Sequence, residues 1–112
     1  MSNGWVKELP FAITVTDRTG SIIEMNDRSA ETFDKYGGKA LIGKNINDIH
    51  SERACQKIAE IIKTEAPNSY TIEKNGVKKL IYQTPWYQDG KYAGLVELSM
   101  IIPAEMPHYV RK

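Results

Sequence analysis

The sequence has little of several features that mark specialised classes of protein. Cys55 is the only cysteine, so no disulfide can form within the chain. No apolar run reaches the roughly 18 residues of a membrane-spanning helix, and residues 1–10 lack the apolar stretch of a signal peptide. The 15 basic residues are balanced by 14 acidic ones, which leaves no surplus positive charge for a nucleic-acid surface. We therefore expect a cytoplasmic domain that contacts neither nucleic acid nor a membrane.

Motifs of catalysis and of metal binding are missing as well. The sequence contains no G-x-S-x-G nucleophile elbow, no H-E-x-x-H zinc motif and no Cys/His cluster with metal-ligand spacing. Residues 38–44 follow the G-x-x-x-x-G-K part of a phosphate-binding loop. However, Asn45 replaces the hydroxyl that would hold Mg²⁺, and a helix rather than a strand is expected before the loop. We interpret this stretch as a bend at Gly43, and we expect a protein that is not an enzyme and binds no metal.

The length of 112 residues and a hydrophobic content of 41% fit one globular domain. Alternating residues and turn signals predict strands over residues 11–16, 21–25, 69–73, 77–86 and 92–102. Apolar periodicity and caps predict helical segments over residues 5–9, 26–36, 46–49 and 51–66. The order β-β-α-α-α-β-β-β predicts an α+β fold with an antiparallel sheet and helices on one side. We expect residues 1–10 to flank this domain, residues 11–102 to form it and residues 103–112 to be a tail.

The last two predicted strands carry apolar residues on both faces. In the first, Leu80 and Tyr82 alternate with Ile81 and Gln83. In the second, Leu95 shares a face with polar Glu97 and Ser99, whereas Val96 and Leu98 share the other, which we expect to face the core. A strand that is apolar on both faces is usually covered on both faces. The helical layer covers one face of these strands. The other face must be covered by the N-terminal helix, a partner domain or a second copy of the chain.

In the order and spacing of these elements the chain resembles the PAS family of sensory domains. The matching positions extend over roughly residues 10–102: Ile13–Asp17, Gly20, Ile22–Ile23, Asn26, Phe33, Leu41–Lys44, Asp48–Ile49, Pro85, Asp89–Gly90 and Gly94. The resemblance implies a five-stranded antiparallel sheet with short helices on one face and a small molecule or cofactor between the two layers. It also implies dimerisation and an output domain, such as a histidine kinase, a diguanylate cyclase or a DNA-binding domain. These 112 residues hold no such output domain, so the chain is either part of a larger sensor or a module that acts on a separate partner.

Two functions from different classes follow from this resemblance. One is a sensor of an unknown small molecule, and the other is a ligand-free module with a filled core that serves dimerisation or docking. The pocket of the sensor would be lined by Ile13, Val15, Ile23, Phe33, Ile46, His50, Ile58, Ile62, Ile81, Gln83, Val96 and Leu98. Branched aliphatic residues dominate this set, and such a set suits a dry core as well as a small pocket.

The sequence requires no cofactor. Ile46 occupies the place where light-sensing LOV members of the family carry a reactive cysteine, so a covalent flavin adduct is excluded there. Haem-binding members use a histidine from the helix that His50 precedes, which makes a haem-based sensor a third alternative. We favour a local hydrogen bond for His50 at the entrance of that helix and expect no haem.

We expect a homodimer that forms through the sheet face opposite the pocket. Its contact residues would be Leu80, Tyr82, Trp86 and Leu95. Leaving them in water would expose an apolar patch, which monomeric proteins usually avoid. The predicted helix over Trp5–Leu9 is too short to cover the face, so a second copy of the chain is the expected cover.

Overall fold

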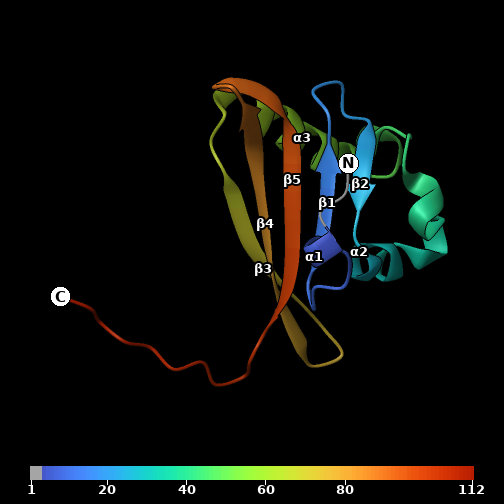
Figure 1. Cartoon of the computed structure of the whole chain (residues 1–112). Coiled ribbons are helices and arrows are strands. Elements are labelled where there is room, and N and C mark those ends of the chain that lie inside the picture. Colours follow the sequence, from blue (N-terminus) through green and yellow to red (C-terminus); the bar gives the residue numbers. More distant parts are fainter. Residues whose placement is uncertain (1–3) are drawn as a thin grey trace.

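The computed structural model of the chain describes residues 4–112. One antiparallel sheet contains five strands in the order β2-β1-β5-β4-β3 (Figure 1). The strands are β1 (Ala12–Thr16), β2 (Ile22–Met25), β3 (Asn68–Lys74), β4 (Val77–Gln88) and β5 (Lys91–Ile102). The helices are α1 (Gly4–Lys7), α2 (Asp27–Thr32), α3 (Glu52–Thr64) and the short 3₁₀ turns η1 (Asp34–Tyr36), η2 (Gly38–Leu41) and η3 (Ile46–Asp48). The predicted α+β class, strand number and element order are confirmed.

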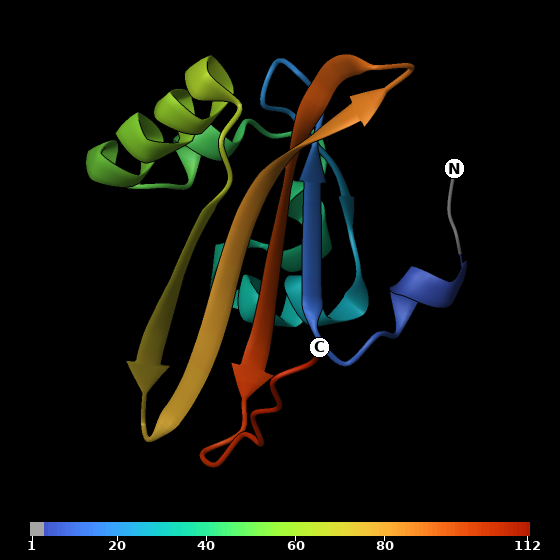
Figure 2. The ribbon, with the colours of Figure 1, turned by 90° about the vertical axis from the view of Figure 1, so that its left-hand side faces the viewer.

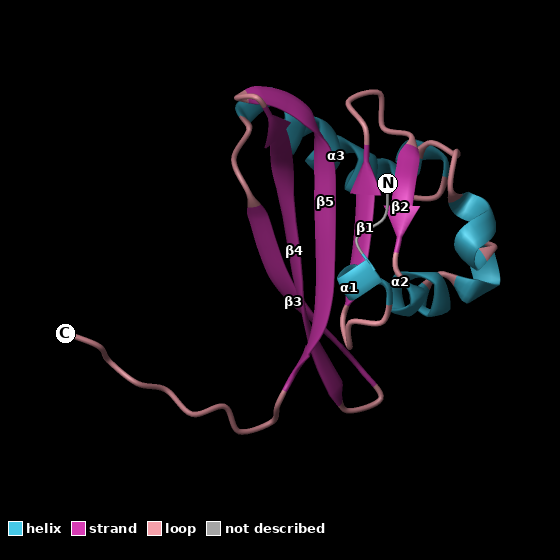
Figure 3. Ribbon diagram, in the orientation of Figure 1, coloured by secondary structure: helices cyan, strands magenta, loops and turns pink. Residues whose placement is uncertain are grey.

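The helices α2 and α3 lie on one side of the sheet, which we call the inner side (Figure 2). The short helix α1 lies beside the sheet, beyond the edge formed by β2. Figure 3 shows that the segment after β5 extends away from the sheet without further helix or strand. Within residues 4–112, no helix combines the length and the hydropathy needed to cross a membrane.

The predicted turns and caps have the expected geometry. Asn75 and Gly76 both adopt positive φ angles, of 53° and 78°, at the β3–β4 hairpin. The hydroxyl of Ser51 accepts a hydrogen bond of 3.2 Å from the backbone N–H of Ala54 and so caps α3. The sequence therefore determined where these elements begin and end through local chemistry alone.

Asn26 caps α2 and joins it to two further elements. Its side-chain oxygen accepts hydrogen bonds of 3.0 Å from the N–H groups of Ser29 and Ile13. Its side-chain nitrogen donates to the carbonyls of Val6 and Phe11, at 3.0 and 2.9 Å. Both ends of the amide are thus satisfied inside the protein, and α1, β1 and α2 are fixed to one another by a single side chain.

The hydrophobic core lies between the inner face of the sheet and the helical layer. Its buried members are Ile22, Met25, Leu41, Ile46, Ile58, Ile61 and Leu95. Burial of each such side chain contributes about 1.5–3 kcal/mol. This cluster anchors α3 through Ile58 and Ile61, one turn apart, and it surrounds the site described next.

Candidate ligand-binding site

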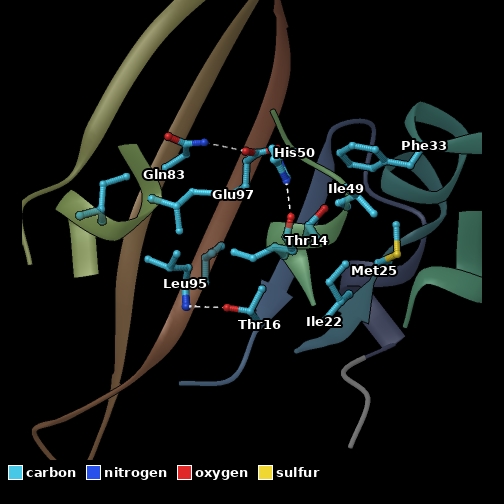
Figure 4. A pocket seen from close by; sticks show the side chains of 14 residues that line it. Thr14, Thr16, Ile22, Met25, Phe33, Ile49, His50, Gln83, Leu95 and Glu97 are labelled. Carbon is cyan, nitrogen blue, oxygen red and sulfur yellow. Dashed lines mark hydrogen bonds between the residues drawn. The ribbon is translucent and has the colours of Figure 1, made fainter. Parts of the chain in front are cut away.

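A cavity of about 30 Å³ lies between the inner face of the sheet and the segments η3 and α3 (Figure 4). Such a volume holds about two water-sized molecules. Its apolar lining residues are Ile22, Met25, Phe33, Ile46, Ile49, Ile58, Ile61, Leu95 and Val96. Its polar lining residues are Thr14, Thr16, His50, Gln83 and Glu97. The inner cavity is therefore largely apolar, with a few polar groups supplied by the sheet and by His50.

The structure brings together part of the residue set that the sequence predicts. Phe33, Ile46, His50, Ile58 and Gln83 line the cavity as expected. Val96 borders it too, although its cross-strand partners Val15 and Thr84 belong to the outer face.

Ile81 faces the same inner side but lines an adjoining hollow of about 240 Å³, together with Tyr70 and Ile72. It is buried, and the hollow shares His50, Phe33 and Glu97 with the cavity. Ile81 therefore belongs to the same side of the sheet without lining the cavity itself.

Five predicted pocket positions are wrong because the inward faces of β1, β2, β5 and α3 differ from the expected ones. The pairings Ile13 with Leu98 and Val15 with Val96 place these residues on the outer face. Ile23 is 47% exposed and lies beside Trp86 in a shallow outer hollow. On α3 the inward positions are Ile58 and Ile61, and the predicted Ile62 is 39% exposed. The misplaced residues are Ile13, Val15, Ile23, Ile62 and Leu98.

Leu95 is also misplaced in the prediction, because it belongs to the core and not to a dimer face. It pairs with Pro85 on the inner side and is only 7% exposed. The inward side of β5 is thus the one that carries Leu95, Glu97 and Ser99, although two of these three residues are polar. A polar side chain can point inward here because it finds a hydrogen-bond partner on the same side of the sheet. For Glu97 that partner is Gln83, which donates a hydrogen bond of 2.8 Å to its carboxylate.

The inward face of β1 is polar for the same reason. The hydroxyl of Thr16 is buried and accepts a hydrogen bond of 3.1 Å from the N–H of Leu95. The hydroxyl of Thr14 pairs with that of Ser29, which is fully buried at the start of α2. Since these threonines satisfy their hydroxyls inside the protein, the apolar Ile13 and Val15 point outward.

A polar chain crosses the open edge of the site. The amide nitrogen of Asn68 donates a hydrogen bond of 2.9 Å to the side-chain oxygen of Gln83. Because that oxygen is engaged, the amide nitrogen of Gln83 is directed to the carboxylate of Glu97, 2.8 Å away. The chain fixes the orientation of the Gln83 amide and holds one carboxylate oxygen of Glu97 (Figure 4).

His50 lies where the inner cavity meets the open space outside it. It lines the cavity, the hollow beside Ile81 and a groove of about 670 Å³ between α3 and β3. Its Nδ1 atom is 2.7 Å from the carbonyl oxygen of Ile46, and a carbonyl can only accept, so Nδ1 carries the proton. This contact agrees with the local hydrogen bond that the sequence suggested, and Nε2 has no hydrogen-bond partner among residues 4–112.

Tyr70 lies on β3 beside the polar chain and lines both the groove and the hollow. Partial burial raises the pKa of its phenol, and the negative charge of Glu97 raises it further. Tyr70 therefore stays protonated at neutral pH and presents a hydroxyl at the mouth of the site.

A metal ion and a haem make different demands on the described part of the chain. Within residues 4–112, no group of three or more His, Cys, Asp or Glu side chains could hold a metal ion. A cavity of about 30 Å³ is far smaller than a haem, so His50 could act as an axial ligand only after the layers move apart. Cys55 lies outside the cavity lining, with its sulfur 3.4 Å from the carbonyl oxygen of Asn47.

The most informative residue that the sequence reading missed is Glu97. A charged residue in the middle of a long, otherwise apolar strand is costly to bury without a partner, and this position could have marked the polar floor of a site. The alternation of Thr14 and Thr16 with branched aliphatic residues is a weaker signal of the same kind. Ile22, Met25, Ile49 and Ile61 carried no signal beyond being apolar.

Comparisons with known proteins agree on the architecture. A family model described as "PAS fold" matches residues 6–100. No curated protein sequence matches the chain significantly.

Solved structures similar to this chain share its fold at low identity. The PAS domain of the histidine kinase ThkA has a TM-score of 0.67 and 17% identity, over 82% of this chain and 99% of that one. The Aer2 receptor of Vibrio cholerae, described as a dual PAS-heme oxygen sensor, has a TM-score of 0.63 and 19% identity, over 83% and 95%. A sensory box sensor histidine kinase of Vibrio cholerae has a TM-score of 0.63 and 15% identity, over 89% and 88%.

Proposed function

This chain belongs to the PAS-fold family, and from that membership we propose that it is a sensory module that binds a small molecule between its sheet and its helices. Binding is relayed to an output domain or to a separate partner, such as a histidine kinase or a diguanylate cyclase. The module works as a homodimer. Its similarity to domains of sensor kinases and of a receptor supports this role.

The observation that carries the proposal is the inner cavity and its surroundings. An apolar pocket with a few fixed polar groups is the usual form of a small-molecule site. Here the apolar lining meets a fixed chain of Asn68, Gln83 and Glu97, and it opens through His50 toward a groove of about 670 Å³. A ligand can therefore enter from the groove and place a small apolar part in the cavity.

Relay through the sheet is supported by where the site residues lie. Gln83 and Glu97 are neighbours on β4 and β5, and the residues next to them, such as Tyr82 and Leu98, form the outer face. A change in spacing between β4 and β5 on the inner side therefore changes the outer face directly, because successive side chains point to opposite sides.

The size of the cavity favours the second candidate, a ligand-free interaction module. A volume of about 30 Å³ is close to what one or two trapped water molecules occupy, and packed cores contain small voids of this kind. In this alternative the outer face carries the function alone.

Mass spectrometry of small molecules released from the purified, denatured protein separates the two candidates. We expect one compound to be enriched with wild type and lost with Ile58→Phe, because the larger side chain fills the cavity. The matched control is Ile62→Phe, which makes the same change on the exposed side of the same helix and should keep the compound. If no compound is enriched with wild type, and none from a metabolite library raises its melting temperature, the ligand-free module is the better account.

A further inference from the structure

One line of paired residues crosses all five strands at the level of the cavity. Asn68 on β3 pairs with Gln83 on β4, and Gln83 pairs with Glu97 on β5. Glu97 pairs with Thr14 on β1, and Thr14 pairs with Met25 on β2. Directly paired residues of an antiparallel sheet point to the same side, so these side chains form a single row on the inner face.

Side-chain hydrogen bonds reach the middle of this row from two directions, from β3 and from α2, but they do not connect there. From the β3 edge, Asn68 donates to Gln83 and Gln83 donates to Glu97. From the helical layer, the hydroxyl of Ser29 pairs with that of Thr14. Among residues 4–112, no side-chain hydrogen bond joins the carboxylate of Glu97 to the hydroxyl of Thr14, and both of these residues line the cavity and the hollow beside it.

The gap is rich in acceptors. A carboxylate has about four acceptor positions, and within the described part of the chain only the bond from Gln83 reaches Glu97. The hydroxyl of Thr14 can make one more hydrogen bond besides the one to Ser29. A group that fills the gap must therefore donate to Glu97, and it can also bond to Thr14.

On the basis of the proposed function, we propose that the ligand of this site is a small alcohol or amine whose O–H or N–H group donates to Glu97 and closes the row between Glu97 and Thr14. Its apolar part rests against Leu95, Ile22 and Ile58 in the cavity. Since the cavity of about 30 Å³ holds only part of such a molecule, the rest extends into the adjoining hollow of about 240 Å³, which Thr14 and Glu97 also line. Carboxylates and other small anions are excluded, since Glu97 is the acidic group that lines the cavity and would repel them.

The test uses four probes of nearly equal size: isopropanol, isopropylammonium, acetone and acetate. Each is titrated into the wild-type chain, and the methyl resonances of Ile22, Ile58 and Leu95 are followed in ¹H–¹³C correlation spectra. A hydrogen bond to a charged group contributes enough for about a tenfold change in affinity. We expect the two donors to shift these methyl signals with a dissociation constant at least about tenfold below that of acetone, and acetate to leave them unmoved.

The variant Glu97→Gln should weaken isopropylammonium by about tenfold or more, because the charge partner is lost. The matched control Glu73→Gln removes a negative charge from β3 at a position outside the cavity lining and should leave all four titrations unchanged. The comparison of isopropanol with acetone needs only the wild-type chain, so it stays decisive if Glu97→Gln does not fold.

Two results would overturn the inference, and they bear differently on the proposed function. Equal shifts with acetone and isopropanol would show that the cavity binds ligands without selecting a hydrogen-bond donor. That result would refute the proposed class of ligand but not small-molecule binding itself. If none of the probes moved the cavity methyl signals, the gap would hold water alone. That result would refute both the proposed class of ligand and small-molecule binding in this cavity.

Discussion

The indole nitrogen of Trp86 donates a hydrogen bond of 2.9 Å to the backbone carbonyl of Thr16. Gly94, the cross-strand partner of Trp86, makes this contact possible. A Cβ atom at position 94 would collide with the same carbonyl oxygen, and the φ angle of Gly94 is 151°. Three strands, β1, β4 and β5, are thus joined at a point where a side chain on β5 is not tolerated.

Gly94→Ala should therefore destabilise the fold severely, by about 3 kcal/mol or more, because a backbone atom has to move. Urea unfolding followed by circular dichroism measures this loss. Gly76→Ala is the control: its φ angle is also positive, but nothing lies within 4 Å of an added Cβ, so it should cost only about 1 kcal/mol. Equal losses in the two variants would show that the close approach of Thr16 is unimportant.

Asn26→Asp should be far more damaging than a cap substitution usually is. Asp and Asn are nearly equivalent as helix caps, but a carboxylate cannot donate to the carbonyls of Val6 and Phe11. We expect a loss of about 3 kcal/mol in the free energy of unfolding, since buried acceptors then face a charge.

Ser51→Asp provides the contrast, because within residues 4–112 the Ser51 side chain makes only the capping bond to Ala54. That variant should stay within about 0.5 kcal/mol of wild type. If Asn26→Asp proved equally mild, the role of Asn26 would be that of a cap alone.

Local signals in the sequence were sufficient for the elements of the fold and insufficient for the faces of its strands. Asn75-Gly76 and Ser51 act through their own backbone chemistry, so the hairpin and the helix start were predictable. Which face of β5 points inward was not predictable, because apolar residues occur on both faces of this strand and polar residues alternate only weakly. Glu97 and Thr14 point inward only because Gln83 and Ser29, distant in sequence, meet them there.

The titration of Tyr70 reports on the same site. Because burial and Glu97 raise its pKa in the folded state, the stability that Tyr70 contributes is complete below about pH 10 and declines as the pH rises through the raised pKa. Glu97→Gln should lower the pKa of Tyr70 but leave it above the ordinary value, since burial is the larger cause. NMR of ¹³C-labelled tyrosine measures this. An unchanged pKa would mean that the two groups are farther apart than the structure shows.

Haem should not bind in a manner that depends on His50. The cavity of about 30 Å³ is far smaller than a haem and would have to open widely to admit one. After addition of haem, the visible spectrum of wild type should match that of His50→Ala, with His108→Ala as the control for the other histidine. A sharp Soret band that disappears only in His50→Ala would revive the haem-based sensor.

The outer face of the sheet should hold two copies of the chain together. The corrected registers place Ile13, Val15, Leu80, Tyr82, Val96, Leu98 and Met100 on this face. Its centre is therefore more apolar than the sequence reading supposed, even without Leu95. Helix α1 lies beside the β2 edge of the sheet, and Trp5 is 70% exposed. A face of this composition buries well against a second copy of itself, in a two-fold dimer.

Tyr82→Glu tests this dimer by analytical ultracentrifugation. Tyr82 lies between Ser69 and Leu98 in the middle of the outer face, so the variant places a charge where a dry contact is expected. Wild type should sediment as a dimer, and the variant should sediment as a folded monomer with an unchanged circular dichroism spectrum. Tyr36→Glu makes the same chemical change at an exposed position on η1, within the helical layer, and should remain dimeric. A wild type that stays monomeric at high concentration would refute the dimer, and so would a folded Tyr82→Glu variant that associates as tightly as wild type.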